Sequence, residues 1–276
     1  MVIVDNKRSK HKDFFIDGVR ITAFSKDSLW EQVYEKIQLG QSAVVVAINP
    51  EKIMQASRDK NLMLYLSSFD FPIADGVGIV LVSKLKGGCI RYRLTGTDIM
   101  EDMVSRSNKI DAPLFLYGAK PGIAKLAAEK LEKKYPGIRI VGTLDGYQSD
   151  PSTVVNAIKA SGAKIVFVAL GSPRQEYFMY QNREALEGCI LQGVGGSFDV
   201  ISETKIRAPL FFRKLGLEWL YRLICEPWRL TRQWDILRFL FLTVVRPLKK
   251  AKLLYEKTDS LFPMVSYSLH GAAANF

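Results

Sequence analysis

Short apolar runs alternate with stretches of helical periodicity over about the first 204 residues of the chain. Several of the runs are continuous blocks of Val, Ile, Leu and Phe, which is typical of parallel strands buried on both faces. The apolar runs predict strands at Ser42–Ile48, Phe71–Ala74, Pro113–Tyr117, Ile138–Thr143, Ile165–Leu170 and Ile190–Val194.

Five segments between these strands have helical patterns. Ahead of the first of them, Asn49 can cap the helix and Pro50 suits its first turn. Because strands and helices alternate along the chain, we predict an α/β fold with a Rossmann-like parallel sheet as its core. The predicted helices are Glu51–Leu66, Thr97–Ser107, Pro121–Tyr135, Ser152–Ala160 and Pro173–Leu186.

The pattern changes after Ile206. The segment Pro209–Lys257 is rich in Leu, Phe, Trp and Arg, and it predicts helices without strands. Its longest apolar run, Phe239–Val245, is far shorter than the roughly 18 residues that a bilayer-spanning helix needs. We therefore predict two parts, an α/β core at 1–204 and a helical C-terminal appendage at 205–276.

Charge is concentrated in the predicted appendage. The 276 residues include 39 Lys and Arg against 28 Asp and Glu, a net charge of +11, and residues 205–257 alone have 13 against 4. Aromatic residues alternate with arginines in this segment, which favours an amphipathic surface that binds anionic membranes. A basic helix packed on the core and a nucleic-acid surface are the alternatives, but no nucleic-acid-binding motif accompanies the charge.

Histidine and cysteine usage argues against several kinds of active site. His11 and His270 lie near the two ends of the chain, so a Ser-His-Asp or Cys-His centre is not expected. The cysteines at positions 89, 189 and 225 are widely spaced, which argues against disulfide or CxxC zinc sites and suits a reducing cytoplasm. Acid–base chemistry is therefore expected from Asp or Glu.

Two further absences in the sequence limit the function. The polar N-terminal residues lack the apolar segment of a signal peptide, which predicts a cytoplasmic protein. The chain has no Asp-x-Asp sequence and no cluster of His, Cys and carboxylates at metal-ligand spacing. We therefore expect no metal cofactor at a diphosphate site.

Ligands of open α/β sheets bind beyond the carboxyl ends of the strands, where two glycine-containing loops are candidates. Gly118 and Gly122 lie where a strand turns into a helix, and such a turn either approaches a phosphate or is simply tight. Gly171 opens the second loop, in which Ser172 can cap the next helix and Gln175 would project from its first turn. Capping alone does not account for the adjacent Arg174 and Gln175.

Asp75 is the strongest candidate for acid–base chemistry. It follows the strand Phe71–Ala74 and precedes Gly76, so its carboxylate can be partly desolvated and act as a general base. Capping of the next helix by Asp75 is the competing explanation.

The polar motifs together resemble the WecG/TagA/CpsF family of glycosyltransferases. Each motif is short, but their order along residues 20–235 makes the set specific. The motifs are Asn49-Pro-Glu51, Ala74-Asp75-Gly76, Arg93-Leu-Thr-Gly96-x-Asp98, Asp145-Gly-Tyr147, Gly171-Ser-Pro-Arg-Gln175-Glu176, Gly193-Val-Gly-Gly196-x-Phe-Asp199, Arg207-Ala-Pro209, Leu217-Glu-Trp219-Leu-Tyr-Arg222, Glu226-Pro227, Arg229 and Arg232.

The resemblance implies an inverting, metal-independent enzyme of the GT-E type on the cytoplasmic face of the bacterial plasma membrane. Such enzymes transfer an N-acetylmannosamine-type sugar from UDP to N-acetylglucosamine linked to undecaprenyl diphosphate, for cell-surface polysaccharide. A different UDP-hexose donor, such as glucose, or a silent UDP-sugar-binding protein are the alternatives. The resemblance leaves open whether the chain forms a homo-oligomer, and it implies no nucleic-acid partner.

The resemblance also implies roles for individual residues. Asp75 would be the base, and Asn49, Arg93 and Gln175 would line the pocket for the sugar and the acceptor. Tyr147 and Asp199 would hold the uridine. Three arginines of the appendage, Arg222, Arg229 and Arg232, would reach toward the diphosphate. The sequence departs from the family at Ala47, where members carry a threonine that lines the pocket.

Overall fold

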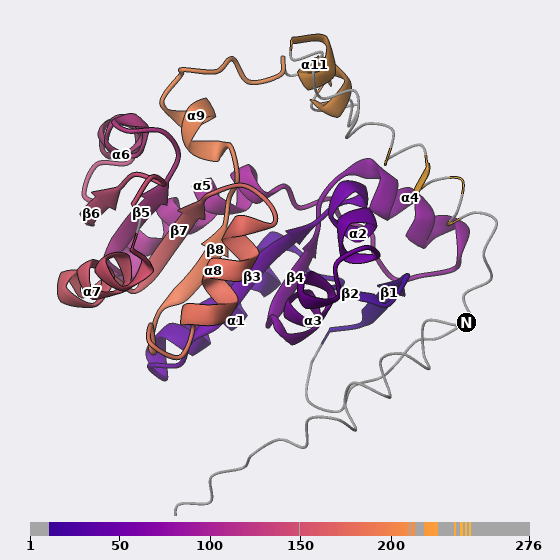
Figure 1. Ribbon diagram of the computed structural model, residues 1–276, viewed down its shortest axis with the longest axis horizontal. Coiled ribbons are helices and arrows are strands. Elements are labelled where there is room, and N and C mark those ends of the chain that lie inside the picture. The colour runs from indigo at the N-terminus through magenta and orange to yellow at the C-terminus, as the bar shows by residue number, and fades with distance from the viewer. Residues whose placement is uncertain are drawn as a thin grey trace, which may run out of the picture.

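The apolar runs form one six-stranded parallel sheet with the order β4-β3-β8-β7-β5-β6 (Figure 1). The computed structural model describes residues 11–148, 150–209, 211–212, 218–225, 235, 238–239, 241 and 243, with Arg222 described by its backbone alone. The predicted α/β class is confirmed, and each predicted strand lies within two residues of its observed bounds. The strands are β3 (Ala43–Ile48), β4 (Phe71–Ala74), β5 (Leu114–Gly118), β6 (Ile140–Leu144), β7 (Ile165–Ala169) and β8 (Ile190–Gly193).

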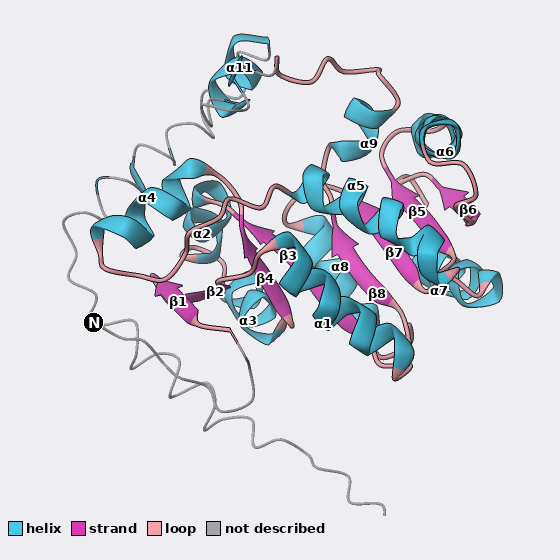
Figure 2. Cartoon of the chain, turned by 180° about the vertical axis from the view of Figure 1, so that it is seen from behind, coloured by secondary structure: helices cyan, strands magenta, loops and turns pink. Residues whose placement is uncertain are grey.

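Helices cover both faces of the sheet (Figures 1 and 2). On the face turned to the viewer in Figure 1 lie α2 (Pro50–Ala56), α3 (Lys60–Ser68), α7 (Pro151–Ser161) and α8 (Arg174–Asn182). On the opposite face lie α1 (Lys26–Gln38), α5 (Gly96–Ser107), α6 (Ile123–Lys134) and the short α9 (Ser197–Ile201).

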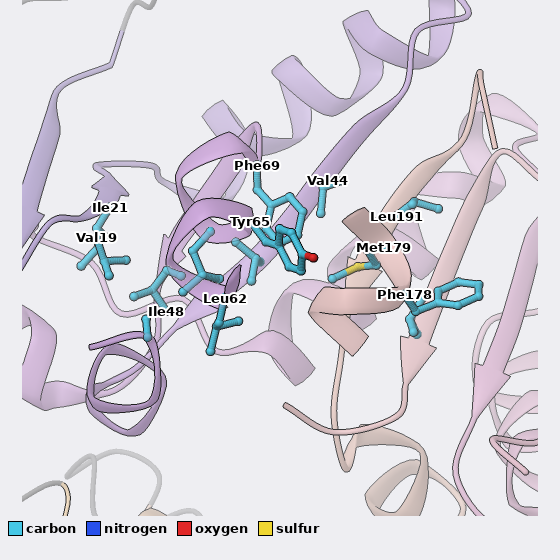
Figure 3. Close-up of a cluster of buried hydrophobic side chains, with 14 of the residues drawn as sticks. Val19, Ile21, Val44, Ile48, Leu62, Tyr65, Phe69, Phe178, Met179 and Leu191 are labelled. Carbon is cyan, nitrogen blue, oxygen red and sulfur yellow. The ribbon is translucent and has the colours of Figure 1, made fainter. Parts of the chain in front are cut away.

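Alternation along β3 explains how one strand supplies both halves of the core. Val44, Val46 and Ile48 join the cluster under α2, α3 and α8, which Figure 3 shows in part. Ala43, Val45 and Ala47 point the other way, into the cluster under α1 and α5. Successive side chains of a strand point to opposite faces, so a continuous apolar run is what a sheet covered on both faces requires.

The helix predicted over Glu51–Leu66 is wrong in one respect, because the chain breaks it into α2 and α3. Asp59 lies at the break and caps α3, accepting hydrogen bonds from the backbone N–H groups of Asn61 (3.0 Å) and Leu62 (3.1 Å). A side chain that satisfies the free donors of a new helix stabilises the restart against a continuous helix.

Two strands and two α-helices in the N-terminal half of the chain were not predicted. The hairpin of β1 (Asp13–Ile16) and β2 (Val19–Thr22) turns at Asp17-Gly18, where both residues have positive φ. Helix α1 begins after Ser25, which forms a capping box with Ser28. Helix α4 (Val77–Leu85) begins after Gly76. The two-residue hairpin turn and the capping box are both recognisable in a sequence.

Part of the C-terminal segment packs against the core. Phe239 is fully buried in the cluster that also contains α2 and α3 side chains. Asp235 accepts two hydrogen bonds from the guanidinium of Arg58, at 3.2 and 2.5 Å. Helix α11 (Glu218–Cys225) is a further described element of this segment. Phe241, by contrast, is exposed, so the aromatic residues of the segment divide between core and solvent.

Gly118 ends β5 where the strand lies against β7. Its φ is +126°, and a Cβ atom at this position would lie 2.5 Å from the carbonyl carbon and oxygen of Ala169. The next residue, Ala119, donates its backbone N–H to the carbonyl oxygen of Ala169 at 2.9 Å. The position therefore requires glycine for both its backbone conformation and its close contact.

We expect Gly118→Ala to lower the free energy of unfolding by more than the substitution Gly122→Ala. Gly122 also has a positive φ (+83°), but no atom lies within 4 Å of the place that a Cβ atom would occupy there. Its substitution should cost only the conformational penalty of about 1–2 kcal/mol. Urea denaturation followed by circular dichroism measures both values, and equal losses would contradict the steric explanation.

Candidate active site

The carboxyl ends of the parallel strands bring the candidate residues to one edge of the sheet. Asp75 follows β4, Asn49 follows β3, Gly195 lies in the turn after β8, and Gly171 follows β7. These four strands are neighbours in that order. Residues far apart in sequence come together there because parallel strands all end at the same side.

Asn49 caps α2, as the sequence predicts. Its side-chain Oδ1 accepts a hydrogen bond from the backbone N–H of Lys52 at 2.8 Å, and Pro50 occupies the first turn. The carbonyl half of the amide is thus used by the helix. Nδ2 is the half that can donate a hydrogen bond to a bound sugar.

Asp75 lies beside Asn49 and is half-buried. Its backbone N–H donates to the carbonyl oxygen of Ile48 at 2.8 Å, which fixes it against the end of β3. The N-cap position of α4 is occupied by Gly76, whose φ is +93°, so Asp75 is not the N-cap residue. A partly buried carboxylate at a strand end is suited to act as a general base.

Arg93 approaches the same strand end from the loop that follows α4. The backbone N–H of Leu94 donates to the carbonyl oxygen of Ala74 at 2.8 Å, so Arg93 and Asp75 flank one hydrogen bond. Arg93 is half-buried. The sheet edge therefore brings a carboxylate, a guanidinium and an amide to adjoining backbone positions.

Asp98, from the same motif as Arg93, has a structural partner. Arg207 forms ion pairs with Asp98 and with Glu101 of α5. Burial opposes ionisation of Asp98, but hydrogen bonds from Thr95 and Arg207 outweigh it and lower the pKa of Asp98. These contacts tie the start of the C-terminal segment to the first turns of α5.

Gln175 is buried and joins two parts of the edge. Its Oε1 accepts from the backbone N–H of Gly195 at 2.9 Å, and its Nε2 donates to Glu176 Oε1 at 2.9 Å. The expected cap is wrong, since α8 has Pro173 at its N-cap without a side-chain hydrogen bond. Ser172 instead donates its hydroxyl to Gln55 Oε1 at 3.2 Å.

Lys52 and Glu176 form a buried ion pair in contact with Gln175. Lys52 Nζ lies 2.6 Å from Glu176 Oε1, and the exposed fractions of the two side chains are 5% and 0%. Burial opposes ionisation of Glu176, but the charge of Lys52 and hydrogen bonds from Lys52 and Gln175 outweigh it and lower the pKa of Glu176. The pair joins α2 to α8, the helices that follow β3 and β7.

The loops after β5 and β6 form the other half of the edge. The backbone N–H of Gly146 donates to the carbonyl oxygen of Ala119 at 2.9 Å, and Arg174 Nη2 donates to the carbonyl oxygen of Gly146 at 3.2 Å. Tyr147 follows with an exposed side chain, its backbone N–H held by Asp145 Oδ1 at 2.9 Å. An exposed aromatic ring directly after a glycine turn is suited to stack on a nucleobase.

Asp199 lies in α9, which packs against α6. Its side chain is half-buried, and its backbone carbonyl accepts from the backbone N–H of Lys205 (2.9 Å) and the hydroxyl of Thr204 (3.0 Å). Because α6 follows β5, Asp199 belongs to the same half of the edge as Gly118.

The described part of the chain lacks two features that would bear on function. Within it, no group of three or more His, Cys, Asp and Glu side chains has an arrangement that could hold a metal ion. The same residues include no helix that is both long and apolar enough to cross a membrane.

Comparison with known proteins identifies the family of the chain. The sequence model of the glycosyl transferase WecG/TagA/CpsF family matches residues 14–253. The chain belongs to this family. The resemblance inferred from the motifs is thus confirmed.

Two relatives of the chain share one name with each other, N-acetylglucosaminyldiphosphoundecaprenol N-acetyl-beta-D-mannosaminyltransferase. The one from Bacillus subtilis (strain 168) is 38% identical over 217 residues, covering 79% of this chain and 84% of the relative. The one from Bacillus spizizenii (strain W23) is 38% identical over 199 residues, covering 72% of this chain and 77% of the relative.

The site residues predicted from the sequence fall into three sets. Asn49, Asp75, Arg93 and Gln175 lie over β4, β3 and β8, while Gly118, Tyr147, Gly171 and Asp199 lie over or beside β7, β5 and β6. Arg222 lies in α11, where only its backbone is described. Arg229 and Arg232 lie outside the described residues.

The Lys52–Glu176 pair is the part of the site that sequence reasoning missed. The sequence indicates Glu176 only as the last residue of the motif that begins at Gly171, and it gives Lys52 no role. The available signal was that each charged residue directly follows a candidate motif residue, Glu51 or Gln175. The partners are 124 residues apart, so their pairing needed the fold.

We expect Lys52→Met and Glu176→Gln each to lower the free energy of unfolding by about 3–5 kcal/mol, because each leaves a buried charge or polar group without its partner. The double variant should lose less than the sum of the two. Urea denaturation of all four proteins measures this coupling. Asp111→Asn, at the exposed Arg139–Asp111 pair, is the control and should change little. Additive losses at Lys52 and Glu176 would contradict the assignment.

Proposed function

We propose that the protein transfers an N-acetylmannosamine-type sugar from UDP to N-acetylglucosamine linked to undecaprenyl diphosphate, with inversion and without a metal ion. The observation that carries the proposal is the half-buried carboxylate of Asp75 at the end of β4, flanked by Asn49 and Arg93, in a member of this family. The names of the two Bacillus relatives support the choice of acceptor and donor.

The proposed reaction is a direct displacement at the anomeric carbon. Asp75 accepts the proton of the acceptor's 4-hydroxyl as that oxygen bonds to the anomeric carbon from the face opposite UDP. The bond from the anomeric carbon to the diphosphate breaks, and UDP leaves with the electron pair. General-base assistance of this kind contributes about 10²–10⁴ in rate.

The leaving diphosphate develops negative charge that positive groups must stabilise. The turns at Gly118 and Gly171, each leading toward a helix N-terminus, can direct backbone N–H groups at phosphate oxygens. We assign Arg222, Arg229 and Arg232 to the same task, because a guanidinium can pair with two phosphate oxygens at once. Tyr147 and Asp199 are assigned to the uridine.

Membrane binding is a further part of the proposal. The acceptor is a lipid, and residues 205–257 have nine more basic than acidic side chains. Such a segment is attracted to an anionic cytoplasmic leaflet. We place the protein on that surface as a peripheral enzyme.

A panel of UDP-sugars with a short-chain lipid acceptor tests the activity. We expect UDP release to be fastest with UDP-N-acetylmannosamine. The panel must also include UDP-glucose and UDP-N-acetylglucosamine, because Ala47 stands where members of the family carry a threonine. Preference for another donor would overturn the donor assignment, and no release with any donor would indicate a silent binding protein.

We expect Asp75→Asn to lower kcat by about 10²–10⁴ while leaving the affinity for UDP unchanged, because the amide cannot accept the proton. UDP release measures turnover, and isothermal titration calorimetry measures UDP binding. Asp111→Asn makes the same chemical change at an exposed site and should retain full turnover. Near-normal turnover of Asp75→Asn would exclude Asp75 as the base.

A further inference from the structure

Helix α4 presents an apolar stripe to solvent. Val77, Leu81 and Leu85 are 38%, 48% and 64% exposed, and they follow one another at intervals of four residues. Side chains at this spacing share one face of a helix, and at 1.5 Å per residue the stripe is about 12 Å long. The core does not need these side chains, since Ile79 and Val82 already fill the buried face.

Exposed basic and aromatic residues accompany this stripe along the chain. Lys84 is in the last turn of α4, and its side chain is exposed. Arg91 and Tyr92 follow in the loop after the helix, and both are exposed, Tyr92 by 62%. Exposed apolar side chains combined with lysine, arginine and tyrosine are the composition of a surface that lies in the headgroup region of an anionic bilayer.

The stripe is attached to the candidate active site at both ends. Val77 is two residues after Asp75, and the loop that follows α4 returns to Arg93 through the Leu94–Ala74 backbone hydrogen bond. A surface bound to lipid at α4 would therefore hold the proposed base next to the lipid headgroups. The acceptor sugar of a polyprenyl diphosphate would also lie next to the lipid headgroups, because the diphosphate joins it directly to the lipid.

We propose that the exposed face of α4, formed by Val77, Leu81, Lys84 and Leu85, contacts the surface of an anionic bilayer together with Arg91 and Tyr92 of the loop that follows the helix. The benefit of this contact to catalysis rests on the proposed function, whereas the contact itself does not depend on it. It adds a membrane contact within the α/β core to the one assigned to the C-terminal appendage.

Two other occupants fit the observations less well. A second copy of the chain would bring the same lysine and arginine side chains together, and a stripe of three residues is small against the roughly 1,000 Å² of a specific interface. The chain's own C-terminal segment is docked elsewhere in its described part, with Asp235 on Arg58 and Phe239 in the core. Val77, Leu81 and Leu85 are exposed in the structure that contains these two contacts.

The test is the double variant Leu81→Gln/Leu85→Gln in the full-length chain. Both side chains are exposed, so the fold should be retained, and thermal unfolding checks this. Co-sedimentation with vesicles of phosphatidylglycerol and phosphatidylcholine should show a partition coefficient about tenfold lower than that of the wild type. Leu39→Gln is the matched control, because Leu39 is 61% exposed but follows α1, at the amino edge of the sheet. It should bind as the wild type does.

A turnover measurement separates this inference from the proposed function. With a short-chain acceptor in solution the double variant should turn over normally, while KM for a long-chain acceptor in vesicles should rise. Vesicle binding needs no turnover, so it tests the surface even if the assigned donor is wrong. Unchanged vesicle binding by the double variant would overturn the inference. A change from dimer to monomer in analytical ultracentrifugation, with vesicle binding retained, would assign the stripe to a second copy.

Discussion

The buried ion pair between Lys52 and Glu176 is the contact on which the geometry of the candidate site depends. It joins α2, which Asn49 caps, to α8, which carries Gln175, across the ends of β3, β8 and β7. Both charges are buried away from water, so each needs the other in place. The pair therefore couples the helices that flank the sheet edge, and a shift of either would move a site residue.

The carboxyl edge of the sheet has two halves with different chemistry. Over β4 and β3 lie Asp75 and Asn49, with Arg93 alongside, a set suited to hydroxyl groups and proton transfer. Over β7, β5 and β6 lie glycine turns held together by Gly146 and Arg174, with the exposed ring of Tyr147. Gln175 connects the halves through Gly195. This separation suits a displacement in which acceptor and leaving group must lie on opposite sides of one carbon atom.

The sequence alone predicted an element correctly wherever its signal was both local and unambiguous. Continuous apolar runs predicted all six parallel strands, and Asn49-Pro50 predicted the start of α2. Polar residues that can satisfy more than one partner were harder to predict. Asp59 restarts a helix that periodicity alone would continue, and Ser172 bonds Gln55 instead of capping α8. The Lys52–Glu176 pair could not be predicted because nothing local to either residue indicates its partner.

The catalytic proposal and the membrane proposal are linked by the short separation between Asp75 and α4. A lipid-linked acceptor has its sugar one diphosphate away from the bilayer surface, so the base must lie within that reach. Asp75 is separated from the apolar stripe of α4 by Gly76 only, and a glycine with φ of +93° allows the strand to turn directly into the helix. A longer linker would move the base out of reach. The short connection thus favours a bilayer contact in the core itself, with the appendage adding affinity and arginines.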